Sequence, residues 1–227
     1  MLNQMLTVIP VRGGSKGIHQ KNMQLVNGKS LVERAVLAAL QIPKNRIVVS
    51  SDDSKILNSV KKYQVELVMR SDENSTDSST SEHVITEVLS ELDISEGVIT
   101  LLQATNPFVD ILSLKRALIY IDLNRSVDSV FSAFEKNAYF WQLKDSWVPI
   151  GHEKTFRLPR QLSPRTAVET GSYYIFQAEK FLQEKTRFCG NSEPFLTHIW
   201  SSFDIDTEED LIFCQKIGKA FDDHFFS

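Results

Sequence analysis

Short apolar runs and amphipathic segments alternate along most of the chain. Four apolar runs, at 6–11, 46–50, 65–69 and 97–102, are rich in β-branched residues and predict buried strands. The segments between them carry apolar residues three and four positions apart, which predicts helices. This alternation predicts an α/β fold.

Capping signals place the first predicted helix at residues 30–40 (SLVERAVLAAL). Ser30 is a good N-cap, and Glu33 three residues later completes a capping box. The same periodicities predict the rest of the fold. The further helices are one up to about residue 63, then 82–92, 111–123, 178–184 and a last one opening at 207, and the further strands are 126–134, 172–176 and one ending at 202–207.

The segment 135–170 breaks this pattern. It holds five aromatic residues of the Tyr, Phe and Trp types and three prolines, without a helical period. A long loop with so much apolar surface is unfavourable in water. We therefore expect hairpins that pack against a second subunit, so that 135–170 is a dimerisation excursion and the protein a homodimer.

Length and composition predict one domain over residues 1–227. With 42% hydrophobic residues, the chain can bury a full core. Its formal net charge is −4 and its charges are interspersed, which argues against a nucleic-acid partner. No apolar run approaches the roughly 20 residues of a membrane span, and no signal peptide is evident, so we expect a soluble, cytoplasmic protein. Cys189 and Cys214 lack metal-type spacing and are expected to be reduced structural thiols.

A glycine-rich loop, residues 12–17 (RGGSKG), follows the first strand directly. Glycines let main-chain N–H groups approach a ligand closely. Three cations, Arg12, Lys16 and Lys21, lie in or near this loop. Donors and cations just past a strand end suit a polyphosphate. The alternative is an ordinary glycine-rich turn with solvated lysines.

Spacing excludes two familiar phosphate-binding loops. The dinucleotide fingerprint needs glycines at its first, third and sixth positions, and no set in this loop fits. Gly28-Lys29-Ser30 resembles the end of a Walker loop, but the leading glycine would fall on Met23. Asn27-Gly28 is instead a hairpin signal. The glycine loop is therefore a nucleotide loop of a different kind.

Polar residues also follow the later strands. Asp52 and Asp53 come after the second strand, where capping of the next helix and contact with a ligand are both open. The serine-rich stretch 71–81 is either a plain loop or a source of hydroxyls at a helix N-terminus. Residues 103–107 (QATNP) follow the fourth strand, at the edge where open α/β sheets bind ligands.

Asp204 and Asp206 alternate along an extended segment, so both carboxylates are predicted to point to the same side. Paired carboxylates suit Mg²⁺, which can hold phosphates at the same time. An EF-hand is excluded because its glycine position falls on Glu209. The alternative for Asp206 is that it only caps the last helix together with Thr207.

Taken in order, the glycine loop, Lys21-Asn22, the run 101–107 (LLQATNP) and the run 204–207 (DIDT) resemble the acylneuraminate cytidylyltransferases, also called CMP-sialic acid synthetases. The resemblance covers nearly the whole chain. It implies a Rossmann-like nucleotidyltransferase fold, with a mostly parallel sheet and helices on both faces, and a homodimer. The implied reaction takes CTP and a nine-carbon α-keto sugar acid to the CMP-sugar and pyrophosphate, with Mg²⁺ as cofactor.

The resemblance also implies roles for single residues. Those implied to be catalytic are Arg12, Lys21 and Asp206, and Asp204 and Asp206 are the implied metal ligands. Together with the loop residues, the nucleotide-binding set is Arg12, Gly13, Gly14, Ser15, Lys16, Lys21, Asn22, Arg70 and Ser81. The implied sugar-binding residues are Gln103, Arg160, Gln161 and Tyr174, the last in a Gly-x-x-Tyr run that begins at Gly171.

Two positions depart from the family pattern. The family commonly has an arginine two residues after Pro-Thr-Ser-Pro, where this chain has Val109. The usual asparagine before the late glycine is Thr170. We expect both changes to fall on the sugar side, so that legionaminic, pseudaminic and other nonulosonic acids are as open as N-acetylneuraminate.

Two other functions remain alternatives. One is activation of an eight-carbon acid of the 3-deoxy-octulosonate type, although the run 15–17 (SKG) favours the nonulosonate branch by resemblance. The other is a catalytically idle, nucleotide-binding paralogue. Val109 and Thr170 favour that alternative, whereas the retained Asp204 and Asp206 oppose it.

Overall fold

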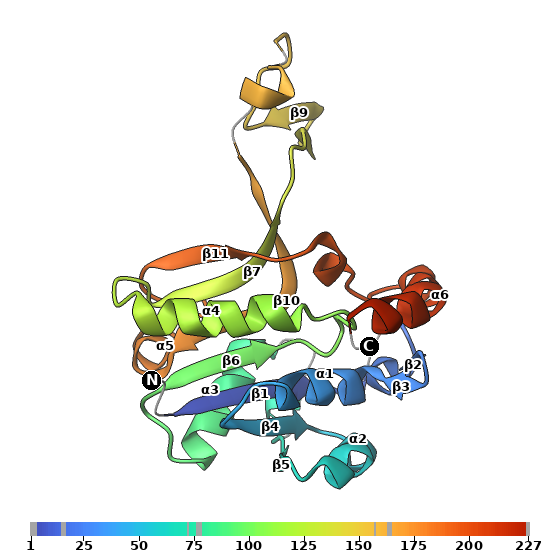
Figure 1. Ribbon diagram of the computed structural model, residues 1–227, viewed down its shortest axis with the longest axis vertical. Coiled ribbons are helices and arrows are strands. Elements are labelled where there is room, and N and C mark those ends of the chain that lie inside the picture. Colours follow the sequence, from blue (N-terminus) through green and yellow to red (C-terminus); the bar gives the residue numbers. More distant parts are fainter. Residues whose placement is uncertain are drawn as a thin grey trace.

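A seven-stranded sheet forms the centre of the protein (Figure 1). The computed structural model describes residues 4–14, 17–71, 73–75, 79–156, 158–162 and 165–225. The strand order is β11-β7-β10-β6-β1-β4-β5. Strand β10 is antiparallel to both of its neighbours, and the other neighbouring pairs of this sheet are parallel. The predicted mostly parallel sheet is confirmed.

The elements follow the predicted order closely. The strands of the large sheet are β1 (Met5–Val11), β4 (Asn45–Ser51), β5 (Glu66–Met69), β6 (Val98–Leu102), β7 (Ser129–Glu135), β10 (Ala167–Gln177) and β11 (Ser192–Leu196). The α-helices are α1 (Leu31–Leu40), α2 (Ser54–Val60), α3 (Ser81–Glu91), α4 (Ile111–Leu123), α5 (Ala178–Glu184) and α6 (Glu208–Phe225). The 3-10 helices are η1 (Lys21–Met23), η2 (Lys61–Tyr63), η3 (Glu73–Ser75), η4 (Arg160–Leu162) and η5 (Ile199–Ser202).

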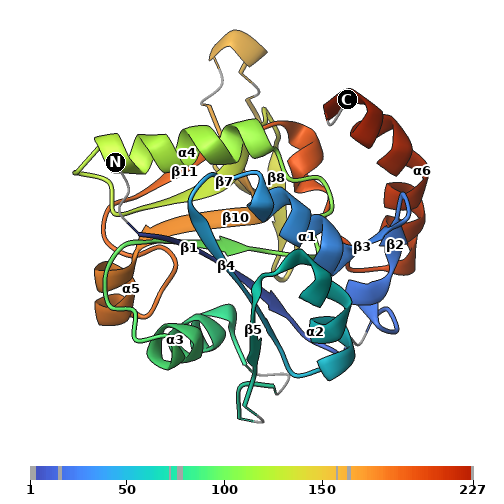
Figure 2. The ribbon, with the colours of Figure 1, turned by 60° about the horizontal axis from the view of Figure 1, so that its bottom comes forward.

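Helices cover both faces of the sheet (Figure 2). Helices α1, α2 and α4 bury residues such as Val32, Ile56 and Leu114 on one face. Helices α3 and α5 bury Ile85 and Phe181 on the other. Strands covered on both faces read as nearly continuous apolar runs, which explains why the sequence showed them so clearly. Within the described residues, no helix has the length and apolar character needed to cross a membrane.

Two local predictions next to the glycine loop are confirmed. Ser30 accepts a hydrogen bond from the N–H of Glu33 at 3.3 Å, and the Glu33 carboxylate accepts one from the N–H of Ser30 at 2.9 Å. Asn27 and Gly28 have φ values of 49° and 75°. They form the turn between β2 (Leu25–Val26) and β3 (Lys29–Ser30), as a type I′ hairpin requires.

Near the C-terminal end, the predicted strand ending at residues 202–207 is absent, and one strand that exists was not predicted. Residues 203–206 form no strand; they follow η5 as an extended segment, in which the N–H of Ile205 donates to the carbonyl of Thr105 at 3.0 Å. The strand β11 was missed. Its sequence, SEPFL, is short and contains Pro194, which is tolerated because β11 lies at the edge of the sheet.

The segment between β7 and β10, residues 136–166, is called the arm. It holds the hairpin of β8 (Phe140–Leu143) and β9 (Trp147–Ile150) and projects away from the sheet (Figure 1). In the single chain its aromatic rings are open to solvent, with Phe140, Trp141, Trp147 and Phe156 exposing 41%, 42%, 61% and 63% of their surface. The predicted excursion therefore exists, with its two ends drawn into β7 and β10.

Candidate functional site

A cavity of about 180 Å³ lies where the carboxyl ends of β1 and β6 meet. Its walls include four of the predicted residues, Arg12, Arg70, Ser81 and Gln103. They come from the ends of β1, β5 and β6 and from the first turn of α3. The structure thus brings residues expected to bind the nucleotide together with one expected to bind the sugar.

Two guanidinium groups belong to this cavity. Arg70 is only 7% exposed; it donates to two backbone carbonyls at 3.0 and 3.3 Å, but its Nε has no partner among the described residues. Burial lowers the pKa of Arg70, and the nearby charge of Arg12 adds to this, against the opposing effect of Asp52 and Glu87. A bound anion would satisfy the unpartnered donor and offset the two positive charges.

The two aspartates after β4 have separate duties. Asp53 caps α2 by accepting a hydrogen bond from the N–H of Lys55 at 2.7 Å. Asp52 accepts one from the N–H of Gly13 at 2.8 Å and so anchors the glycine loop. A Cβ atom on Gly13 would lie 2.7 Å from the Cβ of Asp53, which explains why a glycine occupies this position. Capping is thus confirmed for Asp53, while Asp52 holds the glycine loop and caps no helix.

The chain around the glycine loop is held by its own side chains. Asn22 donates from Nδ2 to the carbonyl of Arg12 at 2.9 Å, and Arg12 donates from Nε to the carbonyl of Gly14 at 2.5 Å. The Oδ1 atom of Asn22 is buried and has no partner among the described residues. Ser15 and Lys16 lie outside the described residues.

Lys21 and Asp206 form an ion pair across the fold. The Nζ of Lys21 lies 3.1 Å from Oδ1 of Asp206, and the Asp206 side chain is 72% exposed. A Cβ on Gly17 would come within 2.6 Å of the Asp206 carbonyl oxygen, so the loop and the aspartate segment touch directly. The pair joins a predicted phosphate ligand to a predicted metal ligand.

The start of α6 does not depend on the Asp206 carboxylate. Thr207 accepts a hydrogen bond at Oγ1 from the N–H of Asp210 at 3.2 Å, and the Asp210 carboxylate accepts one from the N–H of Thr207 at 2.8 Å. This reciprocal arrangement is a capping box made by Thr207 and Asp210. The alternative that Asp206 only caps the helix is therefore wrong: its carboxylate pairs with Lys21 and is not needed for the cap.

Asp204 lies deeper than Asp206. Its Oδ1 is buried and lacks a partner among the described residues. Burial raises the pKa of Asp204 above its ordinary value; the hydrogen bond from Thr105 and the charge of Lys21 oppose this rise, and the charge of Asp206 adds to it. Thr105 was not predicted as a site residue, although it lies in the run 101–107 on which the resemblance rests.

The aspartate pair fits a magnesium ion that is shared with a substrate. A buried carboxylate oxygen without a partner among the described residues, on which the charge of a second, exposed carboxylate acts, offers the kind of ligands that a hard cation prefers. In the described part of the chain, no group of three or more His, Cys, Asp or Glu side chains could hold a metal. Mg²⁺ commonly takes one or two carboxylates and completes its shell with phosphate oxygens and water.

Tyr174 is not among the residues that line the cavity. It is 3% exposed and donates from its hydroxyl to Glu169. The guanidinium of Arg187 lies 4.6 Å from the centre of its ring and pairs with Glu82 at 2.6 Å. Burial and the Glu169 carboxylate raise the pKa of Tyr174. The sequence did not reveal this network, because its charged members are far apart in the chain.

The arm carries the remaining predicted sugar ligands. Gln161 is exposed in η4, which lies in the arm and away from the sheet edge (Figure 1). The backbone of Arg160 belongs to the same 3-10 helix, and its side chain lies outside the described residues. A single chain therefore does not bring Gln161 to the cavity.

The two departures from the family pattern do not lie in the cavity wall. Val109 is buried in the core cluster shared by α1 and α4, on the opposite face of the sheet from α3. Thr170 is buried and donates to the backbone carbonyl of Ser132 at 3.2 Å. Neither side chain lines the cavity, although Gly171, next to Thr170, lies against Gln103, so the effect of the two changes on the sugar side stays a prediction.

Known proteins resemble this chain over most of its length. N-acylneuraminate cytidylyltransferase of Streptococcus agalactiae serotype V is 31% identical over 96% of the chain, which spans 54% of that relative. CMP-N,N'-diacetyllegionaminic acid synthase of Legionella pneumophila is 29% identical, covering 94% of this chain and 96% of the relative. Pseudaminic acid cytidylyltransferase of Campylobacter jejuni is 28% identical, covering 95% and 96%.

A solved structure and a family match agree with the observed geometry. The structure of CMP:2-keto-3-deoxy-manno-octonic acid synthetase complexed with CTP superimposes with a TM-score of 0.74, at 14% identity, covering 96% of this chain and 99% of that one. It confirms the Rossmann-like nucleotidyltransferase fold. The family described as cytidylyltransferase matches residues 6–188. With the glycine loop, the paired guanidiniums and the aspartate segment at one sheet edge, the chain belongs to the cytidylyltransferase family.

Proposed function

We propose that the protein joins CTP to a nonulosonic, sialic-type α-keto sugar acid and releases pyrophosphate. One observation carries the proposal: Arg12 and Arg70 line one cavity, and the Lys21–Asp206 ion pair lies at the other end of the same loop. This arrangement provides an anion site next to a cation site. The legionaminic and pseudaminic acid relatives, which match the chain over almost their whole length, support this substrate class.

The proposed reaction is an attack by the anomeric hydroxyl of the sugar on the α-phosphorus of CTP. The oxygen–phosphorus bond to pyrophosphate breaks as the new bond forms. Such a transfer is catalysed mainly by in-line positioning and by neutralising the charge of the leaving phosphates. Arg12, Arg70 and Lys21 supply the positive charge, and the amide of Gln103 lies in the same cavity wall to orient the acceptor.

Asp204 and Asp206 are the proposed ligands of Mg²⁺. When bound, the ion would neutralise the charge of the phosphates and of the leaving pyrophosphate. In the ligand-free chain, Asp206 is neutralised by Lys21 instead. A triphosphate that attracts Lys21 would free the Asp206 carboxylate, so we expect nucleotide and metal to favour each other's binding.

We further propose that the protein is a homodimer built through the arm. The apolar rings of β8 and β9 are exposed in the single chain, and a second copy offers the same surface in return. Arg160 and Gln161, both on the arm, would then complete a site near the subunit boundary, whereas the buried Tyr174 would take no direct part in it. We also propose that Ser15 and Lys16 of the glycine loop contact the nucleotide.

Pyrophosphate release with CTP, Mg²⁺ and a panel of eight- and nine-carbon keto sugar acids tests the function. We expect turnover with a nonulosonic acid, and none when ATP replaces CTP. Turnover only with a 3-deoxy-octulosonate acid would establish the first alternative. Binding of CTP without turnover of any acid in the panel would establish the idle paralogue, which the retained pair of aspartates opposes.

A further inference from the structure

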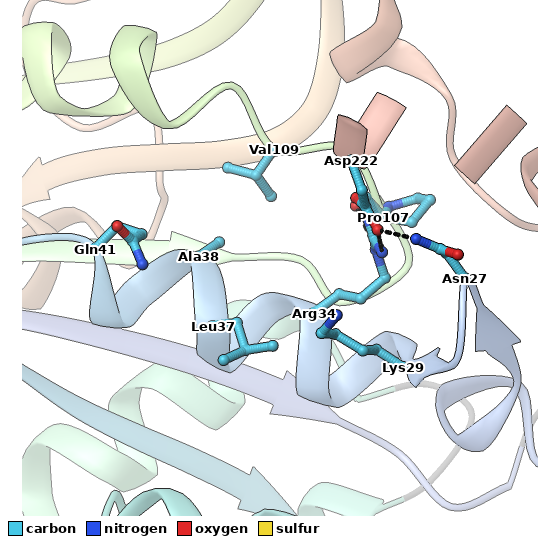
Figure 3. A pocket seen from close by; sticks show the side chains of 9 residues that line it. All are labelled: Asn27, Lys29, Arg34, Leu37, Ala38, Gln41, Pro107, Val109 and Asp222. Carbon is cyan, nitrogen blue, oxygen red and sulfur yellow. Dashed lines mark hydrogen bonds and ion pairs between the residues drawn. The ribbon is translucent and has the colours of Figure 1, made fainter. Parts of the chain in front are cut away.

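A buried guanidinium joins three chain segments outside the cavity (Figure 3). Arg34 in α1 is 8% exposed. Its Nε donates to the carbonyl of Pro107 at 2.9 Å, and its Nη1 donates to the carbonyl of Val26 at 3.3 Å. Nη1 and Nη2 also donate to the two carboxylate oxygens of Asp222 at 2.9 and 2.6 Å. One side chain thus contacts a hairpin, a loop and the last helix.

Each of these segments leads directly to a candidate site residue. Val26 lies in the hairpin that follows Lys21. Pro107 ends the run that begins at Gln103. Asp222 lies near the end of α6, the helix whose first turn follows Asp206. Arg34 touches none of the site residues, but it fixes the segments that carry them.

The Arg34–Asp222 pair lies beside a space that side chains do not fill. A cavity of about 250 Å³ lies between α1, the loop and α6, lined by Leu37, Ala38 and Val109 together with the ion pair (Figure 3). The guanidinium carbon of Arg34 also lies 5.6 Å from the centroid of the Phe108 ring, and the ring centroids of Phe108 and Phe221 are 4.6 Å apart. Apolar contacts of this kind tolerate small shifts, whereas a bidentate guanidinium–carboxylate pair defines both distance and angle.

We propose that Arg34, paired with Asp222, is a positioning residue that sets the placement of Lys21, Gln103 and Asp206 relative to one another. The inference rests on the proposed function. Loss of the pair leaves the remaining charge buried and unpaired. The loop and α6 are then no longer held at fixed positions relative to α1. As a result, Lys21 and Asp206 shift relative to Gln103 in the cavity wall.

The test compares Arg34→Met with a destabilising variant of the apolar core. Val60→Ala serves as the control, since Val60 is fully buried at the end of α2 and lines neither cavity. We expect Arg34→Met to raise the Mg²⁺ concentration for half-maximal activity by roughly 2- to 30-fold, the range of measured long-range couplings. Calorimetric titration of Mg²⁺ into the protein with CTP should show the same weakening. Val60→Ala should change neither quantity.

Two further variants keep the test decisive. Arg34→Lys retains the charge without the bidentate geometry and should recover only part of the loss. Asp222→Asn is nearly isosteric and serves if Arg34→Met fails to fold; it should shift the Mg²⁺ dependence in the same direction. In the double variant the two effects should not add, because they remove one interaction.

The positioning role is overturned if Arg34→Met and Asp222→Asn show the same Mg²⁺ dependence as Val60→Ala. A wild-type protein that turns over no acid of the panel would instead refute the proposed function. In that case the calorimetric titrations of Mg²⁺ with CTP still decide whether Arg34 positions the site. The two failures are therefore distinguishable.

Discussion

The carboxyl edge of the sheet and the arm differ in which side chains they bury and which they expose. At the sheet edge, charged groups are drawn inward and bound to partners from distant parts of the same chain. Arg70 is buried against two backbone carbonyls, and Lys21 pairs with Asp206 across 185 positions of sequence. On the arm, aromatic rings are exposed to solvent. Trp147, for example, has 61% of its surface exposed.

The difference shows which part of the protein is complete within one chain. The charged groups of the cavity and of the Lys21–Asp206 pair are held by hydrogen bonds within one chain, whereas the predicted sugar ligand Gln161 lies on the arm. The arm has a large apolar surface that its own chain leaves open, and surfaces of this kind mark interaction sites. We infer that the nucleotide and metal groups are held within one chain, whereas the arm serves assembly and brings its sugar ligands to a site only in the dimer, and four predictions test this division.

The largest effect is expected for Asp206→Asn. The variant keeps the size of the side chain but removes the charge toward the metal and Lys21. We expect CMP-sugar formation to fall by at least about 100-fold, the cost of losing one charge-stabilising group at a reacting centre. The melting temperature should stay nearly unchanged, because Thr207 and Asp210 cap α6. Glu209→Gln, next to it on the exposed surface, is the matched control; equal activity of both variants would contradict the metal role.

Lys21→Ala should have the next largest effect. Losing one charge-assisted phosphate contact is worth about 1.5–3 kcal/mol, or roughly 10- to 150-fold in kcat/KM at limiting CTP. Stability should change little, since Asp206 is solvated. Lys216→Ala on the exposed face of α6 controls for the loss of a lysine. Wild-type turnover by Lys21→Ala at limiting CTP would exclude Lys21 from the phosphate site.

Trp147→Ala tests the arm. Removing a ring at the centre of an interface costs about 2 kcal/mol, which weakens a dimer by roughly 30-fold. We expect light scattering at micromolar concentration to report about twice 25.9 kDa for the wild type and a lower mass for the variant. Leu123→Ala, at an exposed position of α4, should leave the mass unchanged. A wild-type mass of a single chain would refute the dimer.

The smallest effect is expected for two ion pairs, one in each region. Burial alone would raise the pKa of Glu82, but the hydrogen bond and charge of Arg187 outweigh it and hold that pKa below its ordinary value of 4.5. The pair therefore adds stability above pH 4.5 that is lost as the pH falls through the lowered pKa. We expect Glu82→Gln to cost about 1.5 kcal/mol at pH 7, and less at pH 3.5.

Glu135→Gln is the matched variant at the base of the arm. The Glu135–Arg165 pair is exposed, and exposed pairs contribute little to stability. Urea unfolding at both pH values should therefore separate the two variants. If the two variants lost equal free energy of unfolding at pH 7, the exposed pair of the arm would contribute as much stability as the partly buried pair next to the sheet. That result would contradict the contrast between the two regions.

Much of the fold could be predicted from the sequence because its signals are local. The Ser30–Glu33 capping box, the Asn27-Gly28 turn and the bounds of α4 and α5 all agree with the structure. Each depends on residues only a few positions apart, so neighbouring side chains and backbone angles determine it. The glycine loop after the first strand belongs to the same class of signal.

Tertiary structure alone decided the contacts that join distant segments. The order of strands puts Gln103 beside Arg12 and Arg70, turns Val109 to the opposite face, and closes the core over Tyr174. It also pairs the Asp206 carboxylate with Lys21, whereas Thr207 and Asp210 cap α6. These outcomes depend on strand pairing and on which face of the sheet each helix covers. A sequence pattern carries the period of an element but not its neighbours, and so it specified the residues of the site without their partners.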